Sequence, residues 1–221
     1  MKLLALETAN EQCSVSVVDE TQELFFQLDA RAKAQTQTIL PMIDQGFTQL
    51  GISASELTAI AFSRGPGSFS GVRINAAVTQ ALAWANDLPV VPVSSLQALA
   101  QSAYRLFGLK TVTAVLDARM NEVYIANFEL DDADIMQAVD IEKLLNYDDA
   151  KQIAKFEMVG SGSVLIQPEQ IQYKDLSATS QDIATIARAD VKQKKWVNAE
   201  QALPVYLRDN AWKKIPEQGK S

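Results

Sequence analysis

A glycine- and proline-rich stretch in the first half of the chain decides the fold, and it reads Ser63-Arg64-Gly65-Pro66-Gly67-Ser68-Phe69-Ser70-Gly71-Val72-Arg73. The apolar segment before it, residues 58–63, has the composition of a strand. The alanine-rich segment after it, residues 71–86, is long enough for a helix. Ser68 or Ser70 is placed to cap that helix. The stretch is therefore predicted to be a strand-to-helix turn.

Two interpretations of this turn stay open. Free backbone N–H groups at a helix start attract anions, which makes Arg64, Gly65, Gly67 and Ser68 candidate phosphate contacts. Alternatively, the glycines only allow the turn to pack closely against a neighbour. The stretch lacks the Gly-Lys-Ser/Thr ending of a Walker loop and does not match a dinucleotide fingerprint.

The segments around this turn alternate between strand and helix patterns. Residues 3–8, 14–19 and 23–28 predict a three-stranded antiparallel meander. Residues 36–50 predict a helix that Gly51 ends, with Pro41 expected in its first turn. A strand over 89–93 and a helix capped by Ser94 or Ser95 follow.

A similar order begins again at Lys110. Residues 111–117 and 122–129 predict a strand hairpin, followed by a helix around 141–145, a strand over 156–160 and a helix from 180 to about 189. The sequence therefore predicts an α/β protein of two lobes. The N-terminal lobe is expected to span 1–106 and the C-terminal lobe 107–221, with the last segment able to pack back on the first lobe.

The composition excludes several classes of chemistry. The chain has 221 residues, a net charge of -7, one cysteine and no histidine. Ser-His-Asp and Cys-His nucleophile systems, an imidazole base and a histidine metal site are therefore absent. No internal disulfide can form, and no apolar run approaches the roughly 20 residues of a membrane helix, so we expect a cytoplasmic protein. The acidity argues against broad binding to nucleic acid by this chain alone.

Two carboxylates and one basic run remain as candidates for chemistry. Glu7 ends the first strand and Asp117 begins the second-lobe hairpin, where a carboxylate could hold a magnesium-bound phosphate. Neither adjacent turn contains glycine, which favours structural roles. The run of Lys192, Lys194 and Lys195 predicts a solvated face, with contact to RNA phosphates as the alternative.

The glycine-rich stretch resembles the TsaB (YeaZ) family of tRNA threonylcarbamoyladenosine biosynthesis subunits, and further similarities run along the whole chain. They are Leu6-Glu7-Thr8, Gln37 to Ile43, Asp117-Ala118-Arg119 with Glu122-Val123-Tyr124, Pro204 to Arg208, and Ala211 to Lys214. The resemblance implies a two-lobe actin-like ATPase (ASKHA, ribonuclease H-like) fold with a degenerate nucleotide cleft. It also implies a catalytically inactive partner of the transferase TsaD that works with TsaE, pairs with itself when alone, and reaches tRNA through the complex.

The resemblance places the partner surface on the first two helices and implies neither a cofactor nor a metal. The candidate interface residues are Thr36, Ile39, Leu40, Ile43, Phe47, Arg73, Ile74, Ala76, Ala77, Gln80 and Trp84. Two other hypotheses are an independent actin-like ATPase or small-molecule kinase, which would use Glu7, Asp117 and residues 65–68, and a Ser-Lys peptidase. No Ser/Lys spacing in the sequence favours the peptidase.

Overall fold

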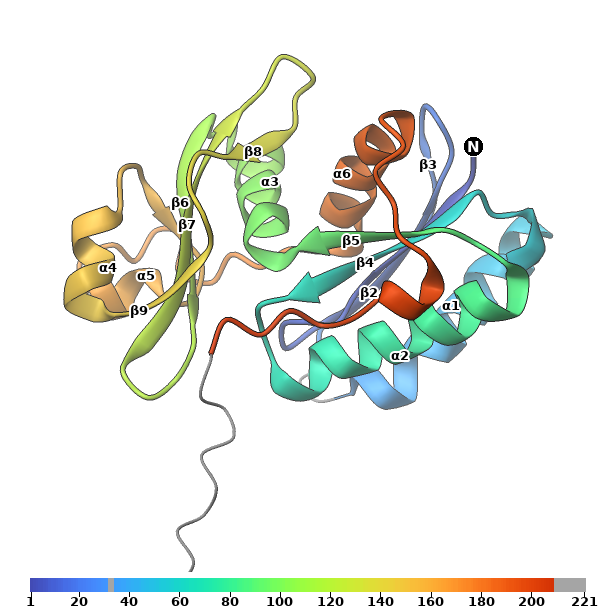
Figure 1. The fold of residues 1–221 in the computed structure, drawn as a ribbon, viewed down its shortest axis with the longest axis horizontal. Helices are drawn as coiled ribbons and strands as arrows, with labels where there is room; N and C mark the ends of the chain where they lie inside the picture. Colours follow the sequence, from blue (N-terminus) through green and yellow to red (C-terminus); the bar gives the residue numbers. More distant parts are fainter. Residues whose placement is uncertain (32–33, 209–221) are drawn as a thin grey trace, which may run out of the picture.

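The computed structural model describes residues 1–31 and 34–208, and in them the chain forms two five-stranded sheets with helices between and outside them (Figure 1). The first sheet contains β1 (Leu3–Glu7), β2 (Cys13–Val18), β3 (Glu23–Asp29), β4 (Ala59–Gly65) and β5 (Val90–Ser94). Its order is β3-β2-β1-β4-β5, antiparallel from β3 to β1 and parallel from β1 to β5. The predicted meander, helix, strand, helix and strand are confirmed.

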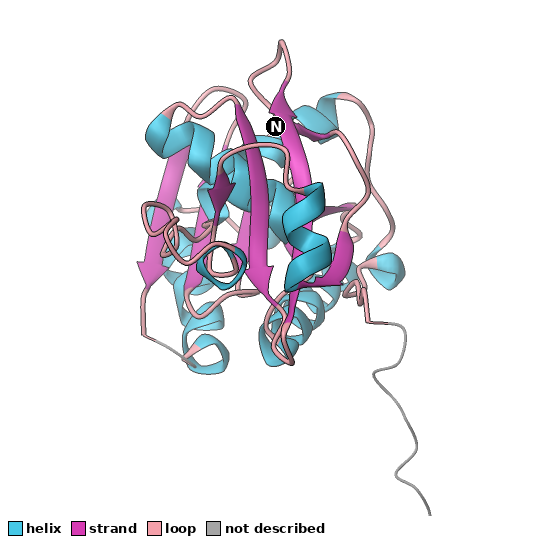
Figure 2. Cartoon of the chain, turned by 90° about the vertical axis from the view of Figure 1, so that its left-hand side faces the viewer, coloured by secondary structure: helices cyan, strands magenta, loops and turns pink. Residues whose placement is uncertain are grey.

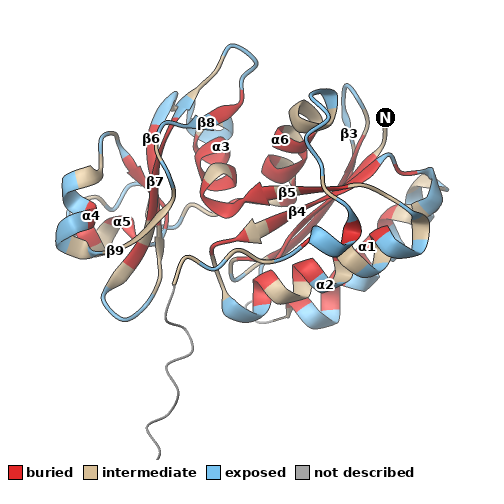
Figure 3. Ribbon diagram, viewed as in Figure 1, coloured by how far each residue is buried: buried red, intermediate tan, exposed pale blue. Residues whose placement is uncertain are grey.

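Helices cover both faces of this sheet. On one face lie α1 (Gln35–Leu50) and α2 (Phe69–Asn86), and on the other α3 (Ser95–Phe107) and α6 (Ser180–Lys192). The alternating strand side chains supply one apolar cluster to each face, with Leu4 and Leu6 on the α1/α2 side and Leu3 and Ala5 on the α6 side. Figure 3 shows the strands buried and the outer helices buried on one side only.

The helix ends are fixed by the residues that the sequence suggests. Gly51 adopts a φ of 63° after α1, and its N–H returns to the carbonyls of Phe47 and Thr48. Ser68 caps α2, and Ser94 caps α3. The expectation for Pro41 is wrong, because α1 begins at Gln35 and Pro41 lies inside it. The carbonyl of Gln37, an exposed residue, therefore lacks its usual helical donor.

The second sheet lies beyond α3. It contains β6 (Thr111–Asp117), β7 (Glu122–Leu130), β8 (Met136–Ala138), β9 (Lys143–Asn146) and β10 (Met158–Val159). The short helices α4 (Tyr147–Ile153) and α5 (Ser163–Ile166) pack on its outer face against the cluster that includes Val115 and Ile125. Figure 2 views the molecule from this side. The layers are thus α4/α5, second sheet, α3 and α6, first sheet, and α1/α2.

The helix expected around 141–145 is wrong. This segment contains the strand β9, whose Leu144 and Leu145 pair with Tyr124 and Val123 of β7. The helix α4 begins directly afterwards, where the Asn146 side chain accepts from the Asp149 N–H at 2.9 Å. In the sequence, the strand and the start of the following helix form one apolar pattern that is typical of a helix. Pairing with β7 gives the first part of that segment its strand conformation.

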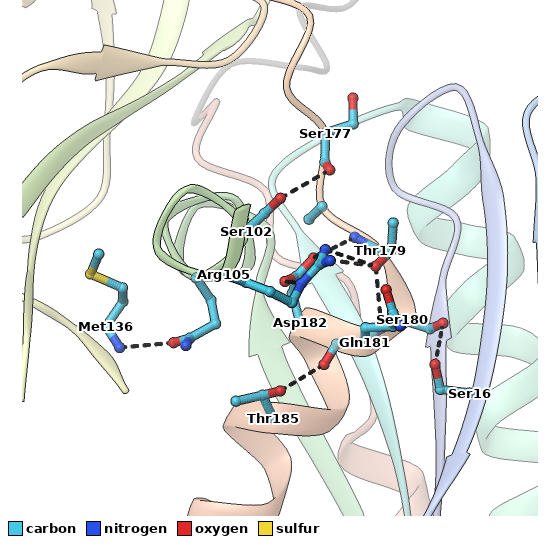
Figure 4. Close-up of polar contacts among 12 residues, drawn as sticks. Ser16, Ser102, Arg105, Met136, Ser177, Thr179, Ser180, Gln181, Asp182 and Thr185 are labelled. Carbon is cyan, nitrogen blue, oxygen red and sulfur yellow. Dashed lines mark hydrogen bonds and ion pairs between the residues drawn. The ribbon is translucent and has the colours of Figure 1, made fainter. Parts of the chain in front are cut away.

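From about residue 178 the chain returns to the first sheet. The α6 N-terminus is bound to β2, since Ser180 Oγ lies 2.7 Å from Ser16 Oγ (Figure 4). The Ser180 N–H also donates to Ser14 Oγ at 2.8 Å. Residue Val197 bridges to Val90, and a 3-10 turn, η2 (Ala199–Gln201), lies against α2. The lobe boundary near residue 106 stays a prediction.

A buried ion pair joins α3 to α6. Arg105 Nε and Nη2 donate to the two carboxylate oxygens of Asp182 at 2.7 and 3.0 Å, and the Thr179 N–H donates to the same carboxylate at 2.8 Å (Figure 4). The Asp182 side chain is 0% exposed, so its charge depends on Arg105. None of the helices in the described ranges has the length and hydropathy of a transmembrane span.

Candidate functional site

The glycine-rich turn packs tightly on the end of β1. The Ser68 N–H donates to the Ala9 carbonyl at 2.7 Å, and Thr8 Oγ1 donates to the Gly71 carbonyl at 2.7 Å. A Cβ atom on Gly67 would lie less than 3.0 Å from the Ala9 carbonyl oxygen, and one on Gly71 equally close to that of Thr8. A side chain at either position would clash with the backbone after β1, so glycine allows the turn to approach β1 this closely.

The other candidate phosphate contacts also have partners within the chain. Arg64 Nη2 lies 3.5 Å from the Glu142 carboxylate, and the Arg64 carbonyl accepts from the Val205 N–H at 2.8 Å. Gly65 has a φ of 97°, which a side chain would strain. Ser68 Oγ accepts the Gly71 N–H at 3.4 Å as the α2 cap. The turn thus connects β1, α2, the second lobe and the returning segment near residue 205.

Glu7 lies at the centre of this packing. Its side chain is 1% exposed, Oε1 accepts from the Ala9 N–H, and Oε2 has no hydrogen-bond partner among the described residues. Burial raises the pKa of Glu7 to about 7, although the Ala9 N–H opposes the rise. The carboxyl group is therefore close to half-protonated near neutral pH, in contact with backbone and not with solvent.

The second-lobe hairpin is held by its own charges. Arg119 Nη1 lies 2.9 Å from Asp117 Oδ2, and three successive residues, Arg119, Met120 and Asn121, have φ values of 62°, 54° and 59°. From the returning segment, Arg208 pairs with Glu122 and donates to the Ala118 carbonyl at 3.2 Å. The hairpin closes without the glycine that a phosphate-wrapping turn favours.

The remaining chemical candidates lie apart from this region. Lys192, Lys194 and Lys195 are all exposed, and Lys195 Nζ lies 3.9 Å from Asp190 Oδ1. The described residues contain no cluster of three or more Cys, Asp or Glu side chains placed to hold a metal ion.

The outer side of α2 carries a continuous stripe of exposed and half-buried residues. Phe69, Arg73, Ala77, Gln80 and Trp84 recur at intervals of three or four positions, as one helix face requires. The Phe69 and Trp84 side chains are each 67% exposed. The Arg73 guanidinium lies 3.3 Å from the centre of the Phe69 ring, so the polar head covers part of the aromatic surface. We call these five residues the α2 stripe.

The structure separates the candidate interface residues of α1 and α2 by burial. Thr36 and Leu40 are exposed on α1, with Leu40 55% exposed. The side chains of Phe47 and Ile74 are half-buried against the core. The residues inside the core itself are Ile39, Ile43 and Ala76, which this chain already covers. The surface available to a partner is therefore narrower than the sequence pattern suggested.

Two aromatic residues beside the turn were missed by sequence reasoning. Phe69 sits one turn before Arg73, and this i,i+4 spacing was the available signal. The centre of the Tyr206 ring lies 4.9 Å from the Arg73 guanidinium, and Tyr206 is 49% exposed. Only the fold brings the returning segment to α2, so no local pattern could reveal that contact. The resemblance at Ala211 to Lys214 lies outside the described residues.

Comparison with known proteins gives a consistent result. Residues 29–215 match the family model described as "TsaD: tRNA N6-adenosine threonylcarbamoyltransferase". The chain is 38% identical to the tRNA threonylcarbamoyladenosine biosynthesis protein TsaB of Escherichia coli, over 98% of this chain and 99% of that one. It is 34% identical to TsaB of Haemophilus influenzae, over 98% of both.

A solved structure agrees with these matches. YeaZ from Pseudomonas aeruginosa superposes with a TM-score of 0.84 at 36% identity, covering 93% of this chain and 99% of that one. The two sheets and their flanking helices are consistent with an actin-like ATPase fold. Identity along the full length, the shared architecture and the glycine turn packed on β1 together show that this chain belongs to the TsaB family.

Proposed function

We propose that the chain is a non-catalytic subunit that binds and supports the transferase TsaD, together with TsaE, in forming threonylcarbamoyladenosine beside the anticodon of tRNAs. The relatives' names assign those proteins to threonylcarbamoyladenosine biosynthesis. In this proposal tRNA is reached through the complex, the chain itself needs neither cofactor nor metal, and two copies pair through the same face when TsaD is absent.

The exposed α2 stripe is the observation that carries the proposal. Burying the exposed two-thirds of the Phe69 and Trp84 side chains would contribute roughly 3 kcal/mol for each ring, before the costs of association. Ala77 lies between them with a small side chain, which lets a partner helix approach closely. Exposed Leu40 on α1 extends the apolar surface. An interface of this kind suits a protein partner.

The non-catalytic assignment is supported by contacts within the chain. These contacts already occupy the side chains that would have to bind phosphate and magnesium. Arg64 is paired with Glu142, and Asp117 with Arg119. Glu7 is enclosed by backbone. A nucleotide-hydrolysing site would need these groups free to meet phosphate and magnesium.

The proposal is tested by calorimetric titration of the chain into TsaD from the same organism, with Ala77→Glu as the interface variant. We expect micromolar or tighter binding for the natural chain and at least tenfold weaker binding for Ala77→Glu, because a charge would be buried in the stripe. Ala133→Glu, an exposed alanine in the second lobe, is the matched control. Circular dichroism confirms that each variant folds.

Two results would contradict the proposal. If the natural chain does not associate with TsaD at micromolar concentration, the subunit role is wrong. If Ala77→Glu binds as tightly as Ala133→Glu, the assigned face is wrong. The rival ATPase or kinase role is measured in the same preparation as ATP turnover that is lost in Asp117→Ala, and we expect no turnover.

A further inference from the structure

A pocket of about 510 Å³ lies between the C-terminal end of α2 and the segment that returns over it. Trp84 and Trp196 both line it, and they are 67% and 42% exposed. Leu88 and Pro89 form part of its wall. Figure 1 shows the short turn η2 lying beside α2 on this side of the molecule. Two exposed indoles give the pocket an aromatic lining, and none of the residues that the structure describes fills it.

The pocket is also negatively charged. Asp87 and Glu200 line it, and both are exposed. Asp87 is the residue that ends α2, in the left-handed conformation with a φ of 52°. A carboxylate at the negative end of a helix dipole is unfavourable, and α2 has no basic residue in its last turn to offset it. Lys195, which is close in sequence, is directed to Asp190.

We propose that this pocket receives an arginine side chain from a partner protein. A guanidinium group is planar, so it stacks on indole rings and at the same time donates to carboxylates in a fork. The pocket offers both kinds of group, since its lining includes the indole rings of Trp84 and Trp196 and the carboxylates of Asp87 and Glu200.

The arginine is assigned to a different protein because every arginine of this chain already has a contact within the chain. All seven arginines lie among the described residues. One of them, Arg73, stacks on Phe69, and another, Arg188, donates to a backbone carbonyl. The other five pair with carboxylates, and they are Arg31, Arg64, Arg105, Arg119 and Arg208. A second copy would have to break one of these contacts. The inference rests on the proposed partner-binding role of α2, because Trp84 belongs to the α2 stripe.

The test follows the indole N–H signals of Trp84 and Trp196 by NMR in the full chain, without TsaD. The probe is acetyl-arginine methylamide, and the matched neutral probe is its citrulline analogue. We expect the arginine probe to shift both signals and the citrulline probe to leave them in place. The double variant Asp87→Asn/Glu200→Gln keeps the shape of the pocket, and its affinity for the arginine probe should be lower by about fivefold or more. Asp132→Asn/Asp148→Asn, in the second lobe, controls for net charge and should change nothing.

Three results would overturn the inference. The first is that both probes shift the indole signals equally. The second is that Asp87→Asn/Glu200→Gln binds the arginine probe as tightly as the natural chain does. The third is that this variant loses self-association in sedimentation, which would assign the arginine to a second copy. The probe does not involve TsaD, so failure here is distinguishable from failure of the subunit role.

Discussion

The buried carboxyl group of Glu7 should make the stability of this protein fall as the pH rises through the acidic range. In the unfolded chain Glu7 ionises near 4.5, whereas in the folded chain burial raises its pKa to about 7. Between these values the unfolded state loses its proton and the folded state keeps it, so unfolding becomes easier as the pH increases. The contribution is fully present below 4.5, declines through the window, and has been lost above 7.

The size of this effect follows from the two pKa values. The difference between 4.5 and about 7, at about 1.4 kcal/mol for each pKa unit, corresponds to roughly 3 kcal/mol of unfolding free energy. Glu7→Gln removes the ionisation but keeps an oxygen that can accept the Ala9 N–H. The amide NH₂ of the glutamine takes the place of Oε2, which has no hydrogen-bond partner in the described part of the chain, so burying these donors lowers the stability of the variant. This loss of stability does not vary with pH.

The assay is urea unfolding of the natural chain and of Glu7→Gln between pH 4.5 and 8. We expect the stability of Glu7→Gln relative to the natural chain to rise by roughly 3 kcal/mol over this range and to level off above pH 7. Glu11→Gln removes the same formal charge at an exposed position and serves as the control. A difference between Glu7→Gln and the natural chain that stays constant from pH 4.5 to 8 would refute the reasoning.

Other substitutions test the packing around the turn and between α3 and α6. Gly71→Ala should destabilise the fold by about 3 kcal/mol or more, because its Cβ would overlap the Thr8 carbonyl, and a thermal melt beside the tolerant Ala77→Ser measures it. Arg105→Leu should cost about 3–5 kcal/mol in urea unfolding, since Asp182 is left buried without its cation. Adding Asp182→Asn to Arg105→Leu should recover part of that loss, and no recovery would mean that the pair is not coupled.

Much of the first lobe was predictable because its signals are local. Alternating strands, the Gly51 end of α1 and the serine caps at Ser68 and Ser94 are each read within a few residues. The second lobe was harder, since β9 has its strand conformation from pairing with β7 and not from its own pattern.

The site depended still more on tertiary structure. Sequence reasoning found the glycine turn and proposed close packing as one of two roles, and the contacts of Gly67 and Gly71 with β1 agree with that role. The partner of Arg64, Glu142, lies 78 positions away, and no periodicity links them. Likewise, helical periodicity does not show which side of α1 packs on the sheet. The position of the sheet determines that Ile39 and Ile43 are buried while Leu40 is exposed.

The return of α6 to the first sheet has a consequence for the order in which the chain folds during synthesis. The apolar face formed by Leu3, Ala5 and Val91 is covered by Ile183 and Ile186, which are made after all five strands of the second sheet. A nascent chain that has reached residue 106 therefore exposes the part of this face that α6 later covers, although α3 has already been made. The second sheet is thus inserted between the strands of the first sheet and the helix that completes its packing, and that packing is complete only when residues 180–192 leave the ribosome.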